Sequence, residues 1–74
     1  MITVAKIEDI ISQIIDNNTF LVEARVHTGN RIMVFVDKKQ GETSLQDCSD
    51  ISRKLEEALN RDQEDFELEV SSPG

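Results

Sequence analysis

The chain has few of the residues that most enzyme chemistry requires. Its 74 residues include no tryptophan or tyrosine, three phenylalanines, one cysteine and one histidine. A single cysteine cannot form a disulfide within the chain, so nothing indicates an oxidising compartment. A cysteine–histidine nucleophile would need both side chains in one cleft. We expect His27 at the end of a hairpin, exposed to solvent, and Cys48 on the buried face of a helix as a small core residue.

Functional motifs and long apolar runs are also missing. The sequence has no CxxC, HExxH or phosphate-binding loop, so we expect no metal, no cofactor, no catalytic residues and no enzyme activity. The apolar stretches are only a few residues long, far short of a membrane span. The first residues lack the pattern of a signal peptide. These absences predict a cytoplasmic protein that does not bind membranes.

Basic residues are scarce, whereas acidic ones are plentiful. Fifteen acidic residues against eight basic ones give a net charge of −7. Such a chain repels a phosphate backbone unless its few cations are clustered. Lys38-Lys39 is an adjacent basic pair in a predicted connection, and we interpret it as an ordinary solvated loop. The charge is compatible with simple solubility and, more specifically, with a basic protein partner.

Apolar residues at helical spacing predict a first helix from about Val4 to Asp16. Five isoleucines recur on one face of this segment: Ile7, Ile10, Ile11, Ile14 and Ile15. Thr3 can cap the start, and Asn17-Asn18 can end the helix.

Two alternating segments then predict a β-hairpin. Phe20, Val22, Ala24 and Val26 share one face of the first strand, and Ile32, Val34 and Val36 share one face of the second. Opposed residues lie on the same side of the sheet, so the apolar positions match only across an odd-numbered loop. A three-residue loop at 28–30 pairs His27 with Arg31.

A second helix is predicted to begin at Ser44, with Asp47 as its capping-box partner. Its apolar face would contain Leu45, Cys48, Ile51, Ser52, Leu55, Ala58 and Leu59. After a charged connection at 61–65, the alternation of Phe66, Leu68 and Val70 predicts a third strand.

The element order α-β-β-α-β predicts one α+β domain over residues 1–74. Both helices would cover one face of a three-stranded sheet in a two-layer sandwich. A right-handed crossover would set the third strand parallel to the second. An antiparallel strand beside the first is the alternative, and the sequence does not decide between them.

The other face of the sheet is then the candidate partner-binding surface. We expect it to carry apolar side chains with an acidic border: Leu21, Met33, Phe35, Glu67 and Glu69. Scattered exposed apolar residues are also normal, and a further domain could cover them.

The segments 31–37, 41–48 and above all 66–74 resemble the N-terminal domain of the RimP family of ribosome maturation factors. The most specific match is Leu-Glu-Val-Ser-Ser-Pro-Gly at 68–74. The chain departs from the family pattern at Leu45-Gln46-Asp47-Cys48, where two adjacent acids commonly precede the cysteine. The family also continues into a small β-barrel domain that is absent from this chain.

The resemblance implies a noncatalytic, monomeric factor for assembly of the small (30S) ribosomal subunit, with the subunit and a basic ribosomal protein as partners. It also implies that Ser71, Ser72, Pro73 and Gly74 set the angle to the second domain. The fold is similar to KH-type RNA-binding domains, which makes direct contact with ribosomal RNA the alternative. That alternative is not favoured, because the KH module clamps RNA with a GxxG loop that this sequence lacks.

Overall fold

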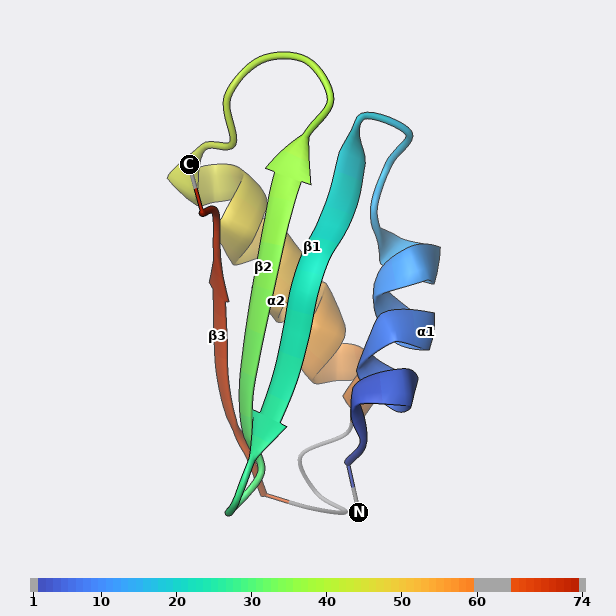
Figure 1. Cartoon of the computed structure of the whole chain (residues 1–74), viewed down its shortest axis with the longest axis vertical. Coiled ribbons are helices and arrows are strands. Elements are labelled where there is room, and N and C mark those ends of the chain that lie inside the picture. Colours follow the sequence, from blue (N-terminus) through green and yellow to red (C-terminus); the bar gives the residue numbers. More distant parts are fainter. Residues whose placement is uncertain (1, 60–64, 74) are drawn as a thin grey trace.

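The computed structural model describes residues 2–59 and 65–73 and contains five elements (Figure 1). In chain order they are α1 (Val4–Ile14), β1 (Thr19–His27), β2 (Arg31–Lys38), α2 (Leu45–Leu59) and β3 (Glu67–Ser71). This order confirms the α-β-β-α-β prediction. The predicted charged connection lies outside the described residues, except for Asp65.

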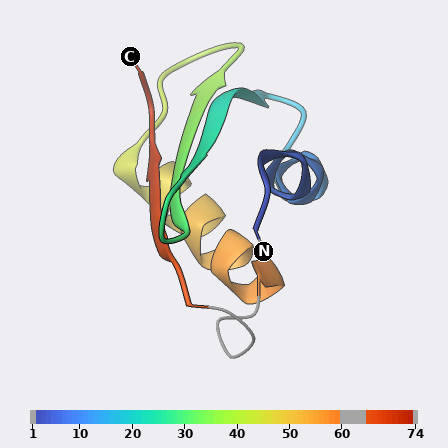
Figure 2. The same ribbon diagram turned by 60° about the horizontal axis from the view of Figure 1, so that its bottom comes forward.

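The sheet has the order β1-β2-β3 and mixed pairing. β1 and β2 are antiparallel, whereas β2 and β3 are parallel, which settles the alternative that the sequence left open. A parallel pair needs a long crossover, and α2 supplies it. Both helices lie on the same side of the sheet, as Figure 2 shows. The two-layer sandwich is therefore confirmed.

The first residues of both helices are held as the sequence predicts. The Thr3 hydroxyl accepts a hydrogen bond from the Lys6 backbone N–H at 3.2 Å. At α2 the bonds are reciprocal: the Ser44 hydroxyl accepts from the Asp47 N–H at 3.1 Å, and Asp47 accepts from the Ser44 N–H at 2.9 Å. Each bond satisfies an N–H that has no partner within the helix.

The β1–β2 hairpin has the predicted register. His27 pairs with Arg31, and Val26 with Ile32, across the loop at 28–30. Gly29 and Asn30 have φ angles of 83° and 57°, in the left-handed region that glycine and asparagine tolerate best. The loop therefore places Ala24 and Val26 of β1 on the same side of the sheet as Ile32 and Val34 of β2, which is the side that the helices cover.

The core lies between the sheet and the two helices. Its buried residues are Ile2, Ile7, Ile11, Ile32, Val34, Val36, Ile51, Leu55, Leu59 and Phe66. Burying each large aliphatic side chain contributes about 1.5–3 kcal/mol. Ala58 and Leu45 were predicted on the apolar face of α2, but Ala58 is exposed and Leu45 is 91% exposed. Leu45 is the first helical residue, where the chain extends beyond the part of α2 that contacts the core.

A β-bulge in β1 overturns part of the predicted facing. The register shifts between Leu21 and Glu23, so Val22 has no partner of its own on β2. An extra residue reverses the facing of everything on one side of it. Phe20 and Val22 were expected in the core but are 40% and 47% exposed. Leu21, expected on the opposite face, packs against the core instead.

Candidate functional site: the open face of the sheet

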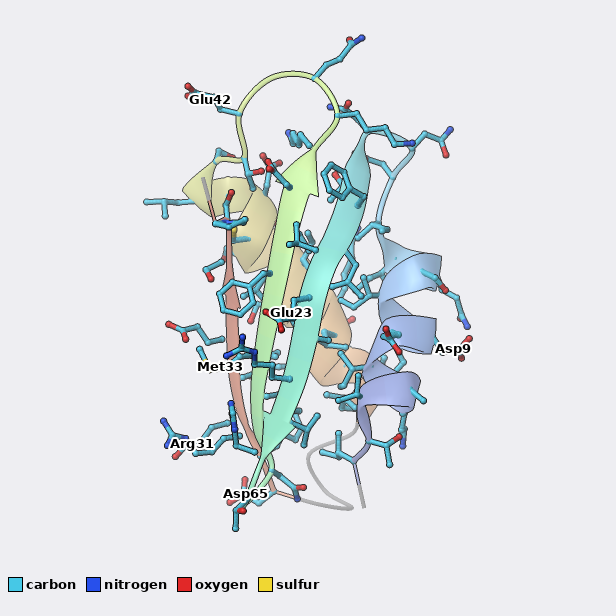
Figure 3. The ribbon with its side chains drawn as sticks, viewed as in Figure 1. Asp9, Glu23, Arg31, Met33, Glu42 and Asp65 are labelled. Atoms are coloured by element: carbon cyan, nitrogen blue, oxygen red, sulfur yellow. The ribbon has the colours of Figure 1, made fainter. Side chains whose placement is uncertain are left out.

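The face of the sheet turned away from the helices carries a row of side chains from all three strands. We call it the open face and define it by the residues opposed across the strands: Phe20, Glu23, Arg25, His27, Arg31, Met33, Phe35, Asp37, Glu67, Glu69 and Ser71. Figure 3 shows Glu23 and Met33 in front of the sheet, on the side away from α2. Of the predicted binding residues, the structure brings together four: Met33, Phe35, Glu67 and Glu69.

Met33 and Phe35 form the apolar centre of the open face. Both are half-buried, and they alternate along the central strand, β2. Met33 lies between Arg25 and Glu69, and Phe35 lies between Glu23 and Ser71. Residues opposed in this way have their Cβ atoms about 4.5–5.5 Å apart. The centre is therefore bordered by polar side chains on both sides.

Leu21 does not belong to this surface, and Phe20 takes its place. Phe20 is opposed to Asp37 at the other end of the strand pair, and it is exposed. The sequence gives only a weak signal for this exchange. Residues 20–22 are all apolar, so alternation cannot tell which of them face the core.

The charges on the open face are partly paired. Arg25 Nε lies 3.0 Å from Glu23 Oε1, and Arg31 Nε lies 3.4 Å from Glu67 Oε2. Both pairs are solvent-exposed and contribute little to stability. Glu69, beside Met33, has no ion pair among the described residues. The open face thus keeps an acidic excess, because its two arginines are outnumbered by four acidic residues.

Lys38 forms an ion pair within the domain. Its Nζ lies 2.8 Å from Asp47 Oδ2, at the start of α2. This contact raises the pKa of Lys38, and with the bonds from Ser44 it lowers the pKa of Asp47 to about 2. Lys39 is exposed in the loop that follows. Of the two adjacent lysines, one therefore forms an ion pair within the domain and the other is solvated.

Cys48 and His27 do not meet. His27 lies at the hairpin end of the sheet, whereas Cys48 is in the first turn of α2, at the opposite end (Figure 1). Cys48 is half-buried beside β3 rather than in the core. Burial raises the pKa of its thiol, and the Asp47 carboxylate raises it further. A raised pKa reduces the thiolate that would act as nucleophile.

The candidate hinge residues continue from β3. Ser71 is the last residue of the strand and is opposed to Phe35. Ser72 is half-buried and lines a shallow groove with Asp37 and the loop at 41–43. Pro73 is exposed, and Gly74 lies outside the described residues. The hinge role itself stays a prediction.

Two other kinds of site can be assessed over the described residues. Within 2–59 and 65–73, histidine, cysteine and acidic side chains form no group of three that could hold a metal ion. Neither helix in this part of the chain has the length and apolar character needed to cross a membrane.

The fold and the open face together define a small two-layer α+β domain with one uncovered sheet face. The family model described as RimP N-terminal domain matches residues 7–74, so the chain belongs to this family. This confirms the resemblance inferred from the sequence.

Three curated relatives are each named Ribosome maturation factor RimP. The protein of Porphyromonas gingivalis is 50% identical over 56 residues, which are 76% of this chain and 36% of the relative. That of Flavobacterium psychrophilum is 40% identical over 57 residues, covering 77% and 36%. That of Christiangramia forsetii is 35% identical over 71 residues, covering 93% and 46%. The chain thus spans less than half the length of these relatives. No solved structure gives a significant match.

Proposed function

We propose that this domain takes part in maturation of the small (30S) ribosomal subunit in the cytoplasm, as a noncatalytic binder of a basic ribosomal protein. The maturation role is supported by family membership and by the names of the relatives. The observation that carries the binding mode is the open face, with Met33 and Phe35 uncovered inside a border that is acidic in sum.

The composition of the open face suits a protein partner better than RNA. Half-buried Met33 and Phe35 would lose their remaining water contact on binding, which is how apolar residues at the centre of an interface contribute. Acidic residues around them would attract a cationic protein and repel phosphate groups. Lys39, in the loop after β2, has no ion pair among the described residues. One such cation is too little to offset a net charge of −7.

The test is a pair of substitutions in the full-length protein, Met33→Gln with Phe35→Ser. We expect binding to purified small-subunit proteins to weaken about tenfold or more, since central apolar contacts dominate interface energies. The matched control is Val4→Ser, which removes an exposed apolar side chain on α1, away from the open face. It should bind like the unaltered protein.

Two results would overturn this proposal. One is unchanged affinity of the doubly substituted, folded protein for small-subunit proteins. The other is tight binding to ribosomal RNA with a steep loss of affinity as salt rises, which marks phosphate neutralisation. The second result would favour the KH-like alternative.

A further inference from the structure

β3 forms an edge of the sheet, and its outer side is unpaired among the described residues. The Glu67 N–H donates to the Asn30 carbonyl, on the β2 side, at 3.0 Å. In a strand, the backbone polar groups of successive residues point to opposite sides. Those of Leu68 and Val70 therefore point away from β2, toward the free edge. Such a row of N–H and C=O groups is a template for another strand.

A shallow, open groove runs beside this free edge. Its walls are the first half of α2, with Leu45, Cys48 and Ser52, and the helix-side residues of β3, Leu68 and Val70. Figure 1 shows that the start of α2 extends past β3 on the outer side of the sheet. The exposure of Leu45, which the core does not explain, places an apolar side chain at this groove.

The charges around the edge favour a basic occupant. Glu69 lines the groove, and its one cation among the described residues, Arg53, lies 3.2 Å from Asp50 Oδ1. On the open face, Glu67 and Glu69 flank the same edge. An added strand would therefore have the carboxylates of Glu69 and of Glu67, which is 3.4 Å from Arg31, beside its open-face side chains.

A second copy of this chain would not suit the edge. Two β3 strands related by a twofold axis pair antiparallel, and residues opposed across them lie on the same face. Glu67 and Glu69 of one copy would then face Glu67 and Glu69 of the other. Opposed like charges destabilise strand pairing.

We propose that the free edge of β3 binds an extended segment of a basic protein partner as a fourth strand. Alternate side chains of that strand would be arginine or lysine beside Glu67 and Glu69, and small or aliphatic residues in the groove beside Leu68 and Val70. Backbone pairing supplies affinity and the alternation supplies specificity. This inference rests on the proposed function for the charge of the partner, and it adds a surface distinct from Met33 and Phe35.

Hydrogen exchange of the unaltered domain tests the inference directly. The probe is a short synthetic peptide in which arginine alternates with valine, and the control peptide has glutamate in place of arginine. With the arginine peptide, the amides of Leu68 and Val70 should exchange at about one tenth of their rate in the free domain, or more slowly still, because they gain strand partners. The glutamate peptide should leave them unchanged. An arginine peptide that binds without slowing these two amides would overturn the inference.

A backbone substitution gives the second test. Val70→Pro removes an N–H that points to the free edge, whereas Val70→Thr keeps it. We expect Val70→Pro to bind the arginine peptide about tenfold more weakly, corresponding to loss of roughly one edge contact, and Val70→Thr to bind normally. Equal binding by the two variants would contradict the inference. If Val70→Pro does not fold, the exchange measurement decides alone.

The two proposals fail separately. If Val70→Pro binds small-subunit proteins normally while the Met33 and Phe35 substitutions abolish binding, strand addition is wrong and the proposed function stands. If neither set of substitutions affects binding to these proteins, both proposals are wrong.

Discussion

Asp47 makes more polar contacts than the other acidic residues of the α2 start. It accepts from the Ser44 N–H and hydroxyl, each at 2.9 Å, and from Lys38 at 2.8 Å. One carboxylate thereby holds the end of β2, the loop that follows and the first turn of α2 together. The sequence predicts the capping box from a spacing of three residues. The sequence does not predict the ion pair between Lys38 and Asp47, because that contact depends on the conformation of the loop at 39–43.

The Asp47 contacts predict a specific loss of stability in acid. The folded-state pKa of about 2 lies below the ordinary value of 3.8, so this contribution is present above 3.8 and is lost as pH falls toward 2. Asp47→Asn should be less stable at neutral pH, and its urea midpoint should fall less between these two pH values. Lys38→Met removes the largest cause of the lowered Asp47 pKa. This variant should also be less stable at neutral pH, and its urea midpoint should also fall less in acid.

Urea unfolding at several pH values checks this prediction. Asp16 also has a lowered pKa, chiefly through a hydrogen bond with Thr19, so some acid dependence should remain in both variants. An Asp47→Asn variant with the full acid dependence of the unaltered domain would contradict the assignment.

At the scale of elements, the bulge in β1 decides which side chains the open face presents. Val22 is the extra residue, and it allows Leu21 to face the core while Glu23 faces outward. The hairpin loop could be predicted, because only a loop with an odd number of residues puts the apolar residues after residue 23 on the same face as those of β2. The bulge could not, because three successive apolar residues satisfy either facing. The same ambiguity put Leu21 on the open face and Phe20 in the core.

Deleting Val22 should therefore be tolerated. The ladder would become regular, and Leu21 and Glu23 would keep their partners on β2. We expect a folded domain destabilised by about 1 kcal/mol, the typical effect of a single change. Deleting Arg25 instead reverses the facing of the residues between it and the bulge, and should unfold most of this small domain. Circular dichroism and urea unfolding of the two deletions provide the comparison, and equal stability would contradict the register.

At the scale of the whole molecule, both candidate binding surfaces, the open face and the free edge of β3, belong to the sheet. The layered fold, the order of the elements along the chain and the placement of four of the predicted residues on the open face all follow from alternation and helical spacing. The free edge of β3 was not foreseen, since the sequence left its neighbour undecided. Leu45 was assigned to the core because helical spacing cannot show where a helix extends beyond the surface it covers.

The most direct measurement of the central claim is an NMR titration of the domain with purified small-subunit proteins. We expect amide signals of the open face, including those of Glu23, Met33, Phe35 and Glu69, to shift on binding. Signals from the solvent side of α1, such as Glu8 and Ser12, should stay in place. Shifts confined to α1, with the sheet signals unmoved, would contradict the claim that the open face is the binding surface.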